Sequence, residues 1–247
     1  MNVSMNRKSS HRRRTKIIAT LGPGTDDPAV LEGMIRAGVD VFRLNMSHGD
    51  AEIQERRARM VREAASKLRW QVAILVDLQG PKIRIEKFEN GSVELTGGDH
   101  FMLDTEHPER PGDDRRVGVS YPDLHKDVEV GDTLLLDDGL ISMQVQAVRG
   151  GQIHCLVENG GTLFDRKGLN LRGGGLSIAG LAAHDRPHIE LAARIGADFV
   201  AVSFVSDASD IEHARSLLRD AGSHAALVAK IERMEAIRNL PEICDVT

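Results

Sequence analysis

Cysteine is scarce in this sequence, and its two cysteines form no recognisable framework. Cys155 and Cys244 lie far apart in the chain and lack CxxC spacing. Two isolated thiols supply neither a disulfide framework nor a structural zinc site. This usage fits a reducing compartment, so we expect a cytoplasmic protein.

Long apolar runs are absent as well. The longest uninterrupted runs, such as Val72–Val76, are far too short to span a bilayer. The first fifteen residues are polar and basic and contain no apolar segment, so we expect no signal peptide. No membrane partner is predicted.

An excess of positive charge is also lacking, since 32 lysines and arginines face 37 aspartates and glutamates. The formal net charge of −5 argues against general polyanion binding, and we expect no nucleic-acid partner. One basic cluster, His11–Arg14, precedes the first apolar segment. We interpret it as a solvated arm, with a phosphate or nucleic-acid contact as the alternative.

The sequence does contain a repeated pattern, in which a helix ends at a glycine and an apolar strand follows. Gly38, Gly196 and Gly222 occupy these helix ends, where left-handed backbone is favoured. Asp27 and Asp185 are predicted to cap the helices that precede Gly38 and Gly196. The strands are apolar on both faces, as buried parallel strands are. Repeated units of this kind predict a parallel sheet or a closed barrel.

The middle of the chain has a different pattern. From about Lys82 to Ser177 the helical period disappears, and residues Ile141–Ala147 alternate between apolar and polar. Turn signals occur at Asp137–Gly139 and at Gly150–Gly151. We predict a small all-β domain here, which divides the chain into residues 1–81, 82–177 and 178–247.

The flanking segments supply five predicted parallel strands: Thr15–Thr20, Val41–Leu44, Val72–Leu78, Phe199–Phe204 and Ala225–Ile231. Roughly 150 residues lie in these segments, whereas a complete (β/α)8 barrel has about 250. Five strands could form an open doubly wound sheet, but they could not close a barrel.

Two glycine-rich segments do not match phosphate-binding loops. Gly173–Gly175 lacks the Lys-Ser or Lys-Thr that follows the glycines of a P-loop, and we interpret it as a flexible return from the middle domain. Gly22-Pro23-Gly24 begins like a dinucleotide fingerprint, but Asp27 stands where the third glycine is needed.

Polar side chains gather where the predicted strands end. In α/β folds these ends face one edge of the sheet and carry the binding groups. Cations, carboxylates and small oxygen donors together suit a phosphorylated substrate and Mg²⁺. The residues concerned are Arg43, Asn45, Ser47, His48, Asp77, Lys230 and Glu232.

Each of these polar residues also has a structural interpretation. Arg43 alternatively serves as an ion-pair partner, and Asp77 as a loop cap. Lys230 and Glu232 alternatively belong to a solvated strand end. His48, considered alone, is better explained as a turn residue than as a base.

Considered together, the motifs resemble those of pyruvate kinases. They cover nearly the whole chain, in order and with matching spacing. The resemblance implies a partial TIM (β/α)8 barrel, about the first five βα units, with a small all-β barrel inserted as a lid. The matching segments are Thr15–Pro23, Phe42–Gly49, Asp77–Arg84, Leu135–Gly139, Lys167–Asn170, Val202–Val205 and Ala229–Arg233.

The resemblance also implies an activity. Pyruvate kinases transfer a phosphoryl group from phosphoenolpyruvate to ADP, which gives pyruvate and ATP in glycolysis. By resemblance, Lys230 would stabilise the transferring group and Arg43 would hold the substrate phosphate. Glu232 would be one of two carboxylates that bind the essential Mg²⁺ or Mn²⁺.

The inserted domain resembles a lid that closes over the nucleotide. Arg84 and Lys167 resemble contacts to the phosphates of ADP or ATP, with His48 nearby. Closure of such a lid excludes water and suppresses wasteful hydrolysis.

A monovalent-cation site is matched in part. Asn45, Ser47, Asp77 and the Leu78 carbonyl correspond to the K⁺ ligands of the family. Members that require K⁺ carry glutamate where this chain has Lys82, and threonine where it has Leu78. A lysine ammonium could replace the mobile ion, so we expect little or no K⁺ dependence.

The sequence ends at Thr247, where the sixth strand of such a barrel is expected to begin. The family's second metal carboxylate lies on that strand, and its allosteric domain follows later. We therefore expect a catalytically incompetent N-terminal portion of an enzyme that is a homotetramer at full length. The alternative is another barrel enzyme acting on phosphoenolpyruvate or a keto acid, which would not need the inserted domain.

Overall fold

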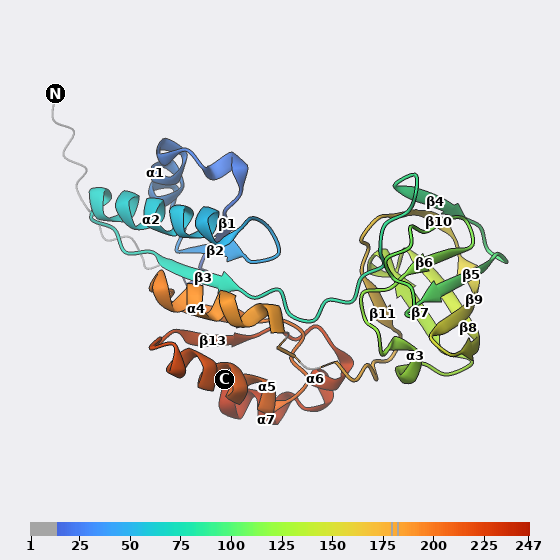
Figure 1. The fold of residues 1–247 in the computed structure, drawn as a ribbon. Coiled ribbons are helices and arrows are strands. Elements are labelled where there is room, and N and C mark those ends of the chain that lie inside the picture. Colours follow the sequence, from blue (N-terminus) through green and yellow to red (C-terminus); the bar gives the residue numbers. More distant parts are fainter. Residues whose placement is uncertain (1–13, 179, 182) are drawn as a thin grey trace.

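The computed structural model describes residues 14–247 except residues 179 and 182. The predicted basic arm at His11–Arg14 therefore lies outside the described residues, apart from Arg14. The described chain contains a curled parallel sheet with helices and, apart from it, a second body built of mainly antiparallel strands (Figure 1). The fold is thus mixed α/β.

The parallel sheet contains the predicted strands. Its order is β1-β2-β3-β12-β13, which is also their order along the chain, and all neighbours are parallel. The prediction of five parallel strands is confirmed. The strands are β1 (Ile18–Thr20), β2 (Val41–Asn45), β3 (Ala73–Asp77), β12 (Phe199–Val202) and β13 (Ala226–Ala229).

The helices of this body are α1 (Pro28–Ala37), α2 (Ala51–Leu68), α4 (Arg186–Arg194), α5 (Ala208–Asp220), α6 (Met234–Arg238) and α7 (Leu240–Val246), with 3-10 turns η1 (Pro23–Thr25) and η3 (Ala183–Asp185). Phe42 of β2 is buried in one core with Leu31 of α1 and Val61 of α2. Successive residues of the central strands β3 and β12 are buried, so the prediction of burial on both faces is confirmed for these two strands. On β2 the side chains that point the other way are partly exposed, and on β13 Ala226 and Val228 are exposed. The prediction is therefore wrong for the strands nearer the edges of the sheet.

Helix ends follow the predicted signals in most cases. The Asp27 carboxylate accepts the Ala29 N–H at 2.8 Å and caps α1. Gly38, Gly196 and Gly222 have φ angles of 101°, 60° and 73°, as left-handed helix ends require. The prediction for Asp185 is wrong, since its side chain does not cap α4. Asp185 is instead fully buried and accepts backbone N–H groups of the chain that follows β3.

The middle of the chain forms its own core, which includes Phe101, Leu134 and Met143. Its main sheet has the order β11-β7-β8-β9-β5-β6, and β4 pairs with β10 beside it. The predicted alternation at Ile141–Ala147 lies within β8, whereas the short helix α3 departs from the all-β expectation. The elements are β4 (Ser92–Leu95), β5 (His100–Asp104), β6 (Arg116–Gly118), α3 (Leu124–Asp127), β7 (Thr133–Leu136), η2 (Asp137–Gly139), β8 (Ile141–Arg149), β9 (Gln152–Asn159), β10 (Gly161–Phe164) and β11 (Leu169–Leu171).

The chain passes between the two bodies twice, after β3 and again after β11 (Figure 1). The carboxyl end of β3 therefore adjoins the first connector. None of the helices in the described ranges is both long and apolar enough to cross a membrane.

Candidate active site

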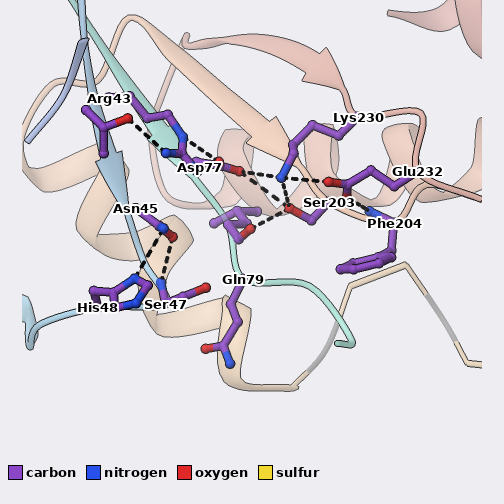
Figure 2. A network of polar contacts seen from close by, with 12 residues as sticks. Arg43, Asn45, Ser47, His48, Asp77, Gln79, Ser203, Phe204, Lys230 and Glu232 are labelled. Carbon is purple, nitrogen blue, oxygen red and sulfur yellow. Dashed lines mark hydrogen bonds and ion pairs between the residues drawn. The ribbon is translucent and has the colours of Figure 1, made fainter. Parts of the chain in front are cut away.

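Asp77 lies at the centre of a polar cluster at the carboxyl ends of the parallel strands (Figure 2). The side chain of Asp77 is only 4% exposed, and a buried carboxylate requires partners. Arg43 lies on one side, with Nη2 2.6 Å from Oδ2 of Asp77. Lys230 lies on the other, with Nζ 3.2 Å from Oδ1. The curled sheet thus brings a cation from β2 and a cation from the end of β13 to one carboxylate.

The Lys230 ammonium is held by three oxygen atoms. Besides Asp77, these are Oε1 of Glu232 at 3.2 Å and Oγ of Ser203 at 2.9 Å. The other oxygen of Glu232 accepts the Phe204 N–H at 3.1 Å. Phe204 has a φ of 56°, which is rare for a bulky residue and marks local strain. That backbone conformation directs its N–H toward Glu232.

Arg43 is fixed across the edge of the sheet. Its Nε donates to Oδ2 of Asp77 at 2.7 Å, and its Nη1 donates to Oγ1 of Thr20 at 2.9 Å. The side chain remains 29% exposed. The alternative interpretation of Arg43 as an ion-pair partner is therefore confirmed by the contacts, and part of the side chain remains exposed.

Asn45, Ser47 and His48 form a turn after β2. Oδ1 of Asn45 accepts the Ser47 N–H at 3.0 Å, and Nδ2 lies 3.2 Å from Nδ1 of His48. The buried Gln54 of α2 donates to the carbonyls of Asn45 and His48. The Leu78 carbonyl, a predicted cation ligand, accepts the Ser203 hydroxyl at 2.7 Å. The proposed K⁺ ligands are thus largely engaged by protein donors.

The predicted nucleotide contacts lie in the second body. Nη1 of Arg84 donates to the Arg166 carbonyl at 2.8 Å. Nζ of Lys167 lies 2.7 Å from Oδ1 of Asp137 and 5.8 Å from the centre of the Phe164 ring. These partners of Arg84 and Lys167 thus lie in the second body, whereas those of Arg43 and Lys230 lie in the body that contains the parallel sheet.

Lys82 faces a cleft between the two bodies. The cleft has a volume of about 240 Å³ and is lined by Lys82, Asp138, Gly168, Asn170, Phe204 and Glu232, among others. Lys82 has no ion-pair partner in residues 14–247 as described, and the cations at Asp77 are Arg43 and Lys230.

Divalent-metal ligands are few at this edge. Among the residues described, no group of three or more histidine, cysteine, aspartate and glutamate side chains could hold a metal ion. Glu232 offers one carboxylate toward the cleft. A single protein carboxylate suits a cation that completes its coordination shell with water and substrate oxygens.

Ser203 was not identified from the sequence alone. It is 1% exposed, and its hydroxyl bridges the Leu78 carbonyl, Lys230 and Asp77, the last at 3.4 Å. The alternation of side chains along the strand was the available signal. Ser203 follows Ala201 by two residues and so lies on the same strand face, and Ala201 is the register partner of Asp77. Thr20 was missed as well, since its hydroxyl contacts Arg43 only through the parallel pairing of β1 and β2.

Comparison with known proteins decides the family. The family model described as pyruvate kinase, barrel domain, matches residues 12–247. The chain belongs to the pyruvate kinase family. Pyruvate kinase II of Salmonella typhimurium is 49% identical over 229 residues, which cover 93% of this chain and 48% of that protein.

More distant members of the pyruvate kinase family give the same result. The pyruvate kinase of Geobacillus stearothermophilus is 42% identical over 95% of this chain and 40% of its own length. That of Thermococcus litoralis is 40% identical over 93% of this chain and 48% of its own length. The chain thus spans about half the length of the curated relatives that it matches.

Proposed function

We propose that this chain forms part of a pyruvate kinase, which transfers a phosphoryl group from phosphoenolpyruvate to ADP and yields pyruvate and ATP. The main support is the environment of Lys230, whose ammonium lies between Asp77, Ser203 and Glu232 at an edge that also carries Arg43. A catalyst of phosphoryl transfer needs such fixed positive charge, because its task is positioning and charge stabilisation.

The proposed architecture follows from the same family. Residues 1–81 and 178–247 supply the first five βα units of a (β/α)8 barrel, and residues 82–177 form an inserted lid. Support comes from the strand order, which runs from β1 to β13 without reversal, as in a barrel. The complete protein is proposed to be a cytoplasmic homotetramer.

Arg43 and Lys230 carry out the charge stabilisation. The Arg43 guanidinium binds the phosphate of phosphoenolpyruvate, and the Lys230 ammonium neutralises charge that develops on the transferring group. Asp77 holds both cations in place before the substrate arrives. Little reorganisation is then needed in the transition state, which is where preorganised charge is most effective.

Glu232 fits a site for Mg²⁺ or Mn²⁺. Both of its oxygens already accept from protein donors, but a carboxylate has about four lone-pair sites and can bind a metal in addition. Mg²⁺ commonly takes one or two carboxylates and completes its shell with water and phosphate oxygens. When bound there, the metal supplies further neutralisation of phosphate charge.

Arg84 and Lys167 are proposed to bind the phosphates of ADP or ATP, with His48 at the facing edge of the sheet. Both cations project from the lid and are only partly buried. Closure of the lid would bring them toward Arg43 and Lys230 and exclude water from the transfer.

The proposed enzyme should work without K⁺. Lys82 lines the cleft beside Glu232, and its ammonium has no ion-pair partner among the described residues, so it is available in place of the mobile ion. We expect less than about a twofold change in rate between Na⁺ and K⁺ buffers, because a tethered cation replaces the mobile one. Activity that appears only after K⁺ is added would contradict this, and Lys82→Glu should create the requirement.

A coupled assay of pyruvate formation by the complete protein tests the proposed function. Lys230→Met should lower kcat by at least about a thousandfold, because it removes the fixed charge at the transferring group. Lys87→Met, at an exposed lysine of the lid, is the matched control and should leave kcat unchanged. A complete protein that forms no pyruvate from phosphoenolpyruvate and ADP would refute the proposal.

A further inference from the structure

The second connector between the two bodies follows an unusual path. It leaves β11 through Gly173, Gly174 and Gly175, whose φ angles are 89°, 85° and 106°. It then passes beside the segment that follows β13 (Figure 1). No strand pairing with the parallel sheet holds residues 172–178, so side chains must fix the path of this connector.

Arg233 binds the connector through two carbonyls. Nη1 of Arg233 donates to the Ile178 carbonyl at 2.9 Å, and Nη2 donates to the Leu176 carbonyl. The Arg233 side chain is only 11% exposed. A guanidinium group that donates to two carbonyls fixes both the distance and the orientation of the connector relative to Arg233, because its donors are planar and rigid.

Glu235 binds the same connector by accepting one of its backbone N–H groups. Its carboxylate accepts from Gly175 N, and its Oε2 lies 3.6 Å from Nε of Arg233. Burial by itself would raise the pKa of Glu235, but the Gly175 N–H and the nearby arginines hold it below the ordinary value. Glycine is favoured at 174, where φ is 85°, and a Cβ there would lie 2.6 Å from the Glu235 carboxylate and displace it.

The lid holds the other side of the connector. The Asp127 carboxylate in α3 accepts the Ser177 N–H and the Tyr121 hydroxyl, each at 2.8 Å. Residues 175–178 are thus bonded to both bodies. Gly173 is different, since a Cβ built on it would meet nothing within 4 Å.

Arg233 and Glu235 are also part of the segment that carries the site. Arg233 directly follows Glu232, and Lys230 lies three residues before Arg233. Residues of both segments also line a small cavity of about 110 Å³, among them Leu171, Gly174 and Glu232. A shift of the connector therefore acts on the backbone next to Glu232.

We propose that Arg233 and Glu235 form a latch, by which the position of the lid is set relative to Lys230 and Glu232. This inference rests on the proposed function. The two residues act as positioning residues and do not touch the substrate. Arg233 and Glu235 hold three backbone groups of the connector, those of Gly175, Leu176 and Ile178, so that lid closure and placement of Glu232 occur together.

The test uses Arg233→Lys in the complete enzyme. Lysine keeps the charge but cannot hold two carbonyls in one plane. We expect amide exchange at residues 175–178 to accelerate roughly tenfold, as loss of one strong hydrogen bond implies. We also expect pyruvate to form in excess over ATP, because a loosened lid admits water, while KM for phosphoenolpyruvate changes less than about twofold.

Matched variants separate the latch from general damage. Gly174→Ala and Gly173→Ala place the same side chain at similar φ angles, but only the former displaces the Glu235 carboxylate. Gly174→Ala should reproduce the excess of pyruvate over ATP, and Gly173→Ala should not. Arg238→Lys, at an exposed arginine of α6, controls for the loss of a guanidinium.

The outcomes distinguish the two proposals. If the unaltered enzyme transfers no phosphoryl group, the proposed function fails, and amide exchange alone then supports or overturns the latch. If the enzyme is active but Arg233→Lys and Arg238→Lys give equal exchange rates and equal pyruvate-to-ATP ratios, the latch is wrong. Similar behaviour of Gly174→Ala and Gly173→Ala would overturn it as well.

Discussion

Single residues in the cluster combine a structural role with a proposed functional one. Asp77 is buried and would be strongly destabilising if unpaired, so its pairing with Arg43 and Lys230 contributes to folding. The same pairing fixes the two cations at the sheet edge. The structural interpretation of Arg43 and Asp77 is therefore compatible with their proposed roles at the site, because one set of contacts satisfies both.

Ser203 provides a sharper test of this arrangement. Ser203→Ala removes the donor to the Leu78 carbonyl and a partner of Lys230. We expect kcat of the proposed enzyme to fall about fivefold, since one net hydrogen bond contributes about 1 kcal/mol, with little change in KM for phosphoenolpyruvate. Steady-state kinetics would show this, and Ser216→Ala, at an exposed position of α5, should have no effect.

Asp104 provides a pH-dependent test outside the site. It is 2% exposed and accepts the N–H groups of Glu106 and His107, and Arg116 donates to it at 2.8 Å. Burial alone would raise the pKa of Asp104, but these donors hold it below the ordinary value of 3.8. Because the folded pKa is the lower one, the contribution to stability is complete above 3.8 and is lost as the pH falls through the folded value.

The Asp104→Asn variant should therefore lower the stability of the second body by about 3 kcal/mol at neutral pH. The difference from the unaltered protein should shrink once the pH falls below 3.8. Urea unfolding of the second body at several pH values measures this difference in stability, with exposed Asp114→Asn as the control. A difference that stays constant with pH would contradict the assigned ion pair.

At the scale of elements, the end of β3 is tightly fitted against the end of β12. Gly80 has a φ of 65°, and a Cβ built on it would lie 2.8 Å from Cβ of Ser203. The buried Asp185 accepts the N–H groups of Gln79 and Gly80 at 3.1 and 3.2 Å. The first connector is therefore anchored where β3 ends, beside the polar cluster.

Gly80→Ala tests this close fit. The variant adds a steric clash to the cost of left-handed backbone, and we expect a loss of about 3 kcal/mol of stability. Gly91→Ala is the matched control, because its φ of 78° is similar but a Cβ there meets nothing within 4 Å. It should lose only about 1 kcal/mol. Equal losses in urea unfolding would mean that the contact with Ser203 is unimportant.

At the scale of the whole molecule, the parallel sheet has two open edges. In the chain as described, β1 pairs only with β2, and β13 pairs only with β12. Ile18 on β1 is 56% exposed and Val228 on β13 is 38% exposed. Unpaired edges with exposed apolar side chains favour association with other chains.

The 247-residue polypeptide expressed by itself should therefore aggregate or unfold. Size-exclusion chromatography with light scattering measures this, and the complete protein serves as the control. A monomer with one cooperative unfolding transition would contradict the expectation. So would robust pyruvate formation by this polypeptide, because an aggregated or unfolded chain holds no active site.

The sequence by itself determined the features that depend on local pattern. The strands, the glycine helix ends and the Asp27 cap were predictable, because neighbouring residues specify them. The family motifs also indicated Arg43, Lys230 and Glu232, since they lie at predicted strand ends. Their proposed roles come from the family, whereas their proximity is a property of the fold.

Only the tertiary structure decided the contacts between distant segments. Asp185 binds Gln79 across 106 residues instead of capping its own helix. Arg233 binds the Leu176 carbonyl across 57 residues, and Ser203 reaches Leu78 across 125. Local pattern does not contain such partners, because they are selected by strand pairing and by the need to satisfy buried polar groups after the chain has folded.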